Sequence, residues 1–166
     1  SRPTSAPSAE NFRLEEVALA SLNDGQVRIK NAYLSLDPYM RGRMSDAKSY
    51  AQPQPLNETM IGGTVGEVVE SRNPAFAVGD KVVGMGGWQL YSTASGRGDI
   101  RKVDTTHIPL SAYLGVVGMP GMTAWYGLNK ICEPKAGEAV CVDAASGAVG
   151  SVVGQLAKLK GCTVIG

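Results

Sequence analysis

Apolar and polar positions alternate over short stretches in the first half of the chain, which is the spacing expected of half-buried β-strands. Gly, Pro, Asn and Asp separate these stretches, and 23–25 (Asn-Asp-Gly) is a clear turn signal. Short strands at close spacing are typical of a small, strongly bent β-barrel. We predict strands at residues 12–19, 26–31, 63–70 and 81–85, and residues 86–91 continue the pattern.

Two segments interrupt this β pattern and are predicted as loops. Residues 33–39 run into a loop because Pro38 disfavours a helical backbone at Asp37. Residues 45–59 are polar and contain Pro53 and Pro55.

The pattern changes near Pro109. Residues 114–128 favour a helix that we expect to be broken at 119–121 (Met-Pro-Gly). From Val140 onward the pattern predicts a buried strand, a helix and a second strand. Four residues in this last helix have the i, i+3, i+4, i+7 spacing of one apolar face, and Gly161 stands where a left-handed C-terminal cap is expected. These four residues are Val149, Val152, Val153 and Leu156.

The predicted fold class is therefore β plus α/β. Residues 1–115 form a β-barrel domain, and residues 116–166 form a linker helix and the first βαβ unit of a parallel sheet. This order places a strand–turn–helix at 140–160, where a phosphate-binding turn would lie.

Composition and charge exclude several classes of function. The net charge is +1 and no basic run is interleaved with aromatic residues, so no nucleic-acid partner is expected. No apolar run approaches the roughly 20 residues that span a bilayer, so no membrane association is expected. Three cysteines without a CxxC pair argue against a disulfide framework, and we expect a reducing, cytoplasmic setting.

Residues 145–150 read Ala-Ser-Gly-Ala-Val-Gly, a variant of the glycine-rich dinucleotide turn. Gly147 would let the backbone approach a pyrophosphate, and Gly150 would let the helix pack closely on the strand. The amides of Ala148, Val149 and Gly150 would then point at the phosphates from the helix N-terminus. Alternatively, the glycines serve only the packing of helix on strand. The acidic residue that would bind the ribose is expected about 20 residues after the motif, at or past Gly166.

Three segments together resemble one family. They are residues 32–41 (AYLSLDPYMR), 118–127 (GMPGMTAWYG) and 144–158 (AASGAVGSVVGQLAK). They are similar to the zinc-free medium-chain reductases, the group of prostaglandin and leukotriene reductases, plant double-bond reductases and bacterial curcumin reductase. The resemblance implies a GroES-like substrate domain followed by a Rossmann domain. It also implies NADPH-dependent reduction of the α,β double bond of a small enone or enal by a homodimer. This chain would be the N-terminal part of such an enzyme, inactive by itself.

The resemblance also assigns residues to the site. Hydride addition to an enone leaves an enolate, which needs a hydrogen-bond donor and later a proton. Tyr39 matches the family's catalytic tyrosine, and Asp37, Pro38 and Tyr39 are expected to contact the substrate. A half-buried Tyr that only packs the mouth of the barrel is the alternative. Arg41 is expected to pair with a structural carboxylate.

The glycine-rich turn points to a dinucleotide, and the choice of NADP(H) over NAD(H) rests on the resemblance alone. Without that resemblance, Met119 and Met122 would be interpreted as core residues. The residues implied to contact NADP(H) are Met119, Pro120, Thr123, Gly147, Ala148, Val149, Gly150 and Ser151.

No metal is expected. The segment where the zinc-dependent relatives carry a catalytic His reads Ile-Gly-Gly-Thr at 61–64, and His107 is the only histidine. The three cysteines are expected to be inert buried thiols. Two other functions stay open, a quinone reductase of the same superfamily and a catalytically silent dinucleotide-binding protein.

Overall fold

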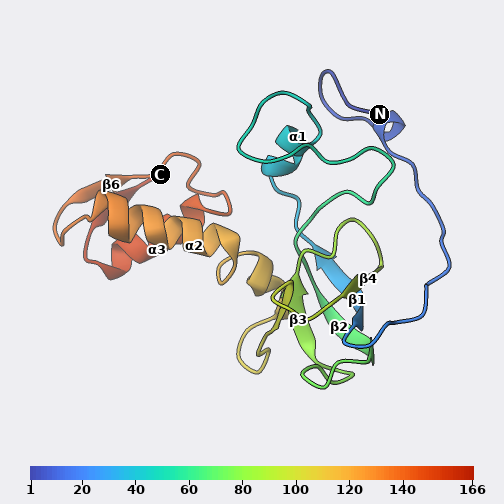
Figure 1. Cartoon of the computed structure of the whole chain (residues 1–166). Coiled ribbons are helices and arrows are strands. Elements are labelled where there is room, and N and C mark those ends of the chain that lie inside the picture. Colours follow the sequence, from blue (N-terminus) through green and yellow to red (C-terminus); the bar gives the residue numbers. More distant parts are fainter. The chain divides into compact units, whose positions relative to one another are not determined.

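The computed structural model describes residues 1–166, and the chain divides into two compact units, Ser1–Asp104 and Thr105–Gly166. The first unit runs from blue to yellow in Figure 1 and carries most of the strands. The division after Asp104 lies earlier in the chain than the domain boundary expected after residue 115. Each unit has its own buried cluster of apolar side chains.

The first unit is built on one antiparallel sheet with the strand order β4-β1-β2-β3-β5. Bulges interrupt the pairing of β1 with β2 after Arg28 and after Asn31, which increases the bend of both strands. The five strands are β1 (Val27–Leu34), β2 (Thr64–Ser71), β3 (Lys81–Gly84), β4 (Tyr91–Ala94) and β5 (Ile100–Lys102).

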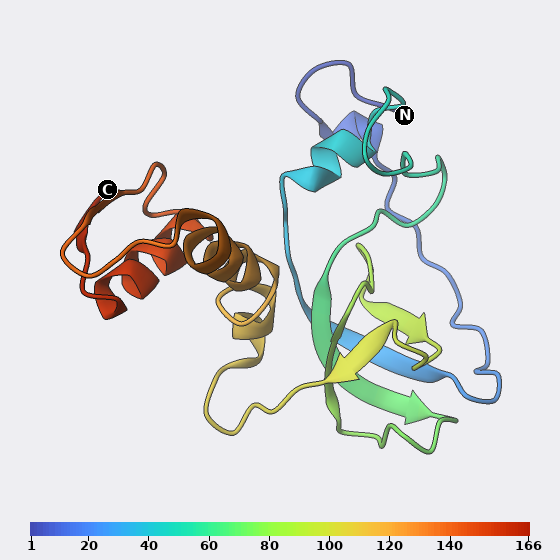
Figure 2. The same cartoon turned by 60° about the vertical axis from the view of Figure 1, so that its left-hand side comes forward.

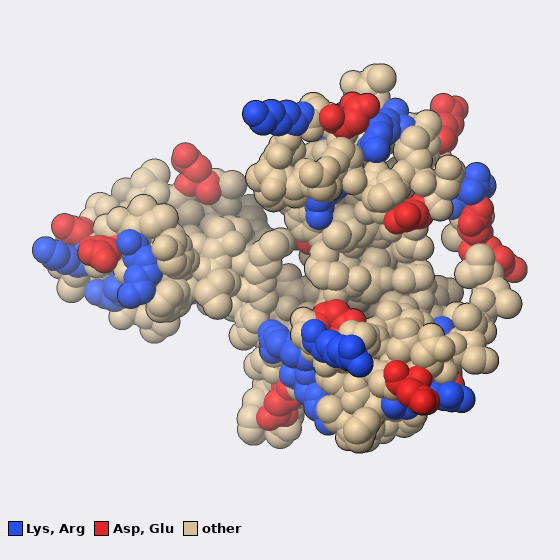
Figure 3. All heavy atoms as spheres, viewed as in Figure 1, with Lys and Arg blue, Asp and Glu red and all other residues tan.

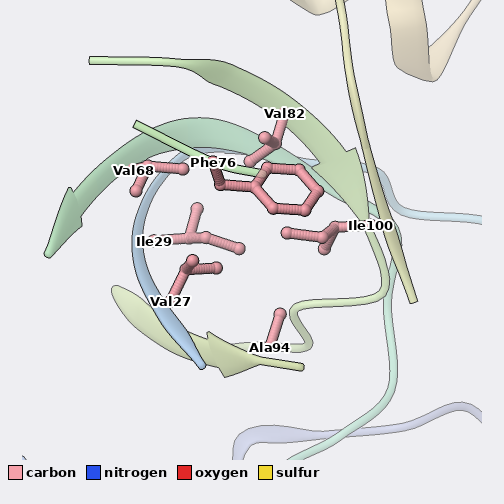
Figure 4. Close-up of a cluster of buried hydrophobic side chains, with 7 residues drawn as sticks. All are labelled: Val27, Ile29, Val68, Phe76, Val82, Ala94 and Ile100. Carbon is pink, nitrogen blue, oxygen red and sulfur yellow. The ribbon is translucent and has the colours of Figure 1, made fainter. Parts of the chain in front are cut away.

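The sheet curls around seven apolar side chains that point toward one another in Figure 4. Ala94 on one edge strand and Ile100 on the other edge strand both belong to this cluster, so the curl brings the two edges together. Val27, Val68 and Val82 are almost completely buried within it. This curled antiparallel sheet confirms the predicted bent β-domain. The strands expected at 26–31, 63–70 and 81–85 are confirmed.

Two predictions for this unit were wrong. Residues 12–19 belong to no sheet, and Leu14 and Val17 are exposed. The ring of Phe12 instead stacks on Trp88, with 5.4 Å between the centroids. Residues 86–90 do not continue the strand pattern either, because the fourth strand begins only at Tyr91.

Short helices stand apart from the sheet in the first unit. They are η1 (Ala9–Asn11) and α1 (Tyr39–Arg43), which both lie above the sheet in Figures 1 and 2. Met40, Met44 and Met60 form a second buried cluster under α1. The polar loop expected at 45–59 contains no helix or strand.

The second unit contains the predicted βαβ order. Strands β6 (Ala139–Cys141) and β7 (Thr163–Ile165) pair in parallel, and α3 (Gly150–Leu159) connects them. Val153 and Leu156 of α3 pack against a cluster of Leu128, Ala157 and Cys162. Before them come η2 (Leu110–Leu114), α2 (Met119–Tyr126) and the π-helical η3 (Gly127–Cys132).

The ends of two helices show how local chemistry sets their length. Gly161 has φ +81°, and the amides of Gly161 and Cys162 donate to the carbonyls of Lys158 and Ala157, which confirms the expected left-handed cap of α3. We had expected Pro120 to break the helix, but it does not break α2. It lies in the first turn, where its missing N–H costs nothing.

Three expectations about burial need correction. Val149 is 37% exposed because it caps α3 rather than lying on the buried face. Cys132 and Cys141 are exposed, and only Cys162 is buried.

Lys and Arg are interspersed with Asp and Glu on the face of each unit that Figure 3 shows. No helix is long and apolar enough to cross a bilayer.

Candidate functional site

The local sequence places Tyr39 at the start of α1. Pro38 has helical backbone angles, and the amide of Met40 donates to the carbonyl of Asp37 (3.0 Å). The amide of Arg41 donates to the carbonyl of Pro38 (3.1 Å). Of the loop expected at 33–39, residues 35–38 are confirmed, whereas Tyr33 and Leu34 belong to β1 and Tyr39 begins α1. The turn at the start of α1 brings Asp37, Pro38 and Tyr39 together.

The side chain of Tyr39 is half-buried and packs against the methionine cluster. Burial raises the pKa of the Tyr39 phenol, and the nearby Asp37 carboxylate raises it further. The Arg43 guanidinium and a hydrogen bond with the Gly63 backbone oppose this shift of the pKa. The net effect is a raised pKa of the Tyr39 phenol.

A hollow of about 460 Å³ lies in the same unit, between the loop that precedes β2 and the turn that follows β3. Arg43 lines it one helical turn after Tyr39, and its guanidinium donates to the carbonyl of Gln52. Sequence reasoning missed Arg43, although the i, i+4 spacing from Tyr39 would have indicated it once α1 was recognised. The lining residues include Arg43, Gln54, Glu58, Thr59, Ile61 and Gln89.

Arg41 has a different partner from the one expected. Its guanidinium donates to the carbonyls of Ser5 (2.9 Å) and Pro3 (3.4 Å) rather than to a carboxylate. Arg2 adds a hydrogen bond to the carbonyl of Gln54 (3.1 Å). The N-terminal segment is thereby held against α1 and against the loop that lines the hollow.

In the second unit, the glycine-rich turn forms a tight support for α3. The amide of Gly147 donates to the carbonyl of Ala144 (2.8 Å). A Cβ atom at Gly150 would lie 2.4 Å from the same carbonyl oxygen, so only glycine fits there. At Gly147 an added Cβ would lie 3.1 Å from that oxygen, which is also tight.

Several amides at this turn have no partner, two of them on exposed residues next to α3. The N–H groups of Ala148 and Val149 make no hydrogen bond, and both residues are exposed just before α3. Free amides at a helix N-terminus, where the helix dipole favours negative charge, suit a phosphate. The residues present therefore fit the pyrophosphate of a dinucleotide. The amide of Ser151 is already bonded to the carbonyl of Gly147 (3.0 Å).

The candidates on α2 lie at its first turn. Met119 is 54% exposed and Met122 66%, so neither is a core residue. The hydroxyl of Thr123 is exposed and donates to the carbonyl of Met119 (2.8 Å). Pro120 is buried. Met119 and Thr123 are therefore accessible in this unit, whereas the side chain of Pro120 is not.

No group of three or more His, Cys, Asp or Glu side chains is placed to hold a metal ion. His107 is exposed in the segment between β5 and η2.

Comparison with known proteins gives consistent matches over the whole chain. Residues 1–103 match a family described as the N-terminal domain of oxidoreductase. The chain is 53% identical over 166 residues to the NADPH-dependent curcumin reductase of Escherichia coli (strain K12), covering 100% of this chain and 48% of that protein. It is 47% identical over 163 residues to prostaglandin reductase 1 of Rattus norvegicus, covering 96% of this chain and 47% of that protein.

A solved structure also matches. The crystal structure of CurA in complex with NADPH from Vibrio vulnificus superimposes with a TM-score of 0.89 and 51% identity, covering 99% of this chain and 48% of that one. The chain spans about half the length of the curated relatives that it matches.

Proposed function

This chain belongs to the medium-chain reductases, in the group of the prostaglandin and curcumin reductases, and we propose that the protein reduces the α,β double bond of enones and enals with NADPH. The observation that carries the proposal is the pair of unpartnered amides at Ala148 and Val149, in a chain so similar to an NADPH-dependent reductase. NADPH, when bound, would supply the hydride that reaches the β-carbon of the substrate.

The second unit would hold the cofactor through its backbone. Ala148 and Val149 would donate hydrogen bonds to the pyrophosphate, and the dipole of α3 would favour its negative charge. Gly147 and Gly150 let this turn pack closely against the carbonyl of Ala144, and that packing sets where the two amides lie. Met119, Pro120, Thr123 and Ser151 are the further proposed cofactor contacts, with the role of Pro120 confined to its backbone because its side chain is buried.

The first unit would supply the proton donor. The Tyr39 phenol would donate a hydrogen bond to the carbonyl oxygen of the enone and stabilise the negative charge that develops there. The phenol is a neutral hydrogen-bond donor at neutral pH, because burial raises rather than lowers its pKa. Asp37 and Pro38 would position Tyr39 because they form the turn on which α1 begins.

Replacing Tyr39 by Phe tests this role. We expect kcat/KM for an enone to fall by about a hundredfold, the usual contribution of a positioned general acid. The dissociation constant for NADPH should not change. Tyr33→Phe is the matched control, because Tyr33 is an exposed residue of β1 in the same unit and should leave kcat/KM unchanged. An enone reaction that is equally fast in Tyr39→Phe would remove Tyr39 from the mechanism.

NADPH oxidation in the presence of an enone and of a quinone separates the possible functions. Enone-dependent oxidation supports the proposal, and oxidation with the quinone alone indicates a quinone reductase. A protein that binds NADPH tightly and oxidises it with neither substrate is a silent dinucleotide-binding protein. Failure to bind NADPH contradicts all three functions.

The domain roles and the state of the protein in the cell are part of the proposal. Residues 1–115 would form the substrate domain and residues 116–166 the start of the cofactor domain. We propose a homodimer in the cytoplasm that needs no metal. The free cysteines support a reducing setting. Light scattering of the purified protein tests whether it is a homodimer, and metal analysis tests whether it needs a metal.

A further inference from the structure

Ala144, the residue before the glycine-rich turn, has an unusual backbone conformation. Its φ is +53°, in the left-handed region that residues other than Gly, Asn and Asp rarely adopt. Its side chain is exposed, so no burial of the methyl group explains this conformation. The explanation must lie in what the backbone of Ala144 does.

The carbonyl of Ala144 contacts both glycines of the turn. Its oxygen accepts the hydrogen bond from the Gly147 amide (2.8 Å). The same oxygen lies only 2.4 Å from the position that a Cβ atom of residue 150 would take. One oxygen atom therefore sets the position of Gly147 and the distance at which α3 begins. Ala148 and Val149, whose amides are free, lie between these two fixed points.

We propose that Ala144 is a positioning residue for the phosphate-binding turn, because its left-handed backbone directs the carbonyl that holds Gly147 and supports Gly150. This inference rests on the proposed function of the turn. It means that Ala144, which precedes the motif at 145–150, fixes the direction of the free amides of Ala148 and Val149. If the left-handed conformation is lost, the carbonyl turns away and the amides of Ala148 and Val149 lose their fixed direction.

Two substitutions of similar size at Ala144 show whether its backbone conformation or its side chain affects NADPH binding. Ala144→Val introduces a β-branched residue that resists positive φ, whereas Ala144→Asn introduces one that tolerates it. Because the side chain is exposed, neither should clash. In the intact protein, Ala144→Val should weaken NADPH binding about tenfold, as expected when a strained conformation must be regained on binding. Ala144→Asn should bind NADPH as the wild type does. Fluorescence titration with NADPH measures both.

Hydrogen exchange gives a readout that needs no cofactor. The Gly147 amide should exchange faster in Ala144→Val than in the wild type and in Ala144→Asn, because its hydrogen bond to residue 144 weakens. Equal protection in all three proteins would overturn the proposal.

Glu133→Val is the control for strain alone. Glu133 also has a positive φ, +46°, at the end of η3. The following segment bonds to the opposite end of α3, where the Gly137 amide donates to the carbonyl of Gly161 (2.9 Å). This variant should lower Tm and leave NADPH binding unchanged. If Ala144→Val binds NADPH as tightly as the wild type, Ala144 has no positioning role. If the wild type itself fails to bind NADPH, the proposed function fails instead.

Discussion

Gly150 is a position in the second unit where a single added methyl group has no room. A Cβ there would lie 2.4 Å from the oxygen and 3.0 Å from the carbon of the Ala144 carbonyl, and both are backbone atoms. Gly150→Ala must therefore displace α3 from the turn. We expect a loss of about 2 kcal/mol in the free energy of unfolding, the usual cost of overpacking, and weaker NADPH binding. Urea denaturation and NADPH titration measure the two effects.

Gly154→Ala in the same helix is the matched control. Its added Cβ would meet only the Val164 side chain at 3.6 Å, an ordinary contact. Ala is favoured over Gly in a helix by about 1 kcal/mol, so this variant should be as stable as the wild type or more so. Gly150→Ala as stable as Gly154→Ala would show that the turn yields to the added methyl group.

At the scale of single residues, spacing predicted some roles and missed others. Gly147 and Gly150 could be recognised because the close approach of helix to turn requires glycine at a fixed interval. Ala144 could not, since a left-handed Ala leaves no compositional signal. Arg41 was assigned a carboxylate partner and instead bonds to the carbonyls of Pro3 and Ser5, and backbone acceptors cannot be found from sequence.

At the scale of elements, Asp80 connects the turn before β3 to β5. Its carboxylate accepts hydrogen bonds from the Ala77 amide (2.7 Å) and from Lys102 on β5 (2.7 Å). These two hydrogen bonds lower the pKa of Asp80 below 3.8, and the one from Lys102 has the larger effect. This stabilisation is present above pH 3.8 and is lost as the pH falls through the lower pKa of the folded state.

Asp80→Asn should therefore be less stable than the wild type at pH 7. The difference in the free energy of unfolding should shrink as the pH falls below 3.8. Urea denaturation over a pH series measures it. Asp24→Asn is the control. Asp24 is fully exposed, and its carboxylate lies 3.6 Å from the Arg72 guanidinium. A surface pair of this kind contributes little to the free energy of unfolding. A difference for Asp80→Asn that does not change with pH would contradict the assignment.

Elements were predicted well where several signals agreed. Alternation and turn residues together located β1, β2 and β3, and the strand–helix–strand order located β6, α3 and β7. Residues 12–19 had alternation alone, and a strand needs a partner that a local pattern does not supply. The three-residue β5 was missed because it is too short to show a period. Pro120 was misread because proline breaks a helix only beyond its first turn.

At the scale of the molecule, the two units differ in how much structure each can support. The first closes five strands around seven buried side chains, and the family match ends at residue 103, next to the structural division after Asp104. The second has two strands of three residues each and one small cluster around Leu128, Ala157 and Cys162. A two-stranded sheet with so small a core is marginal in water.

We therefore expect residues 1–104 to fold alone and residues 105–166 to fold poorly. The first fragment should unfold cooperatively in urea and should keep the near-ultraviolet circular dichroism signal of the Phe12–Trp88 stack. A fragment of residues 1–115 tests the boundary predicted from the sequence. Because η2 (Leu110–Leu114) lies in the second unit, its addition should not raise the midpoint of unfolding. A clear rise would place these residues in the β-domain, as the sequence predicted, and a non-cooperative 1–104 fragment would show that its core is incomplete.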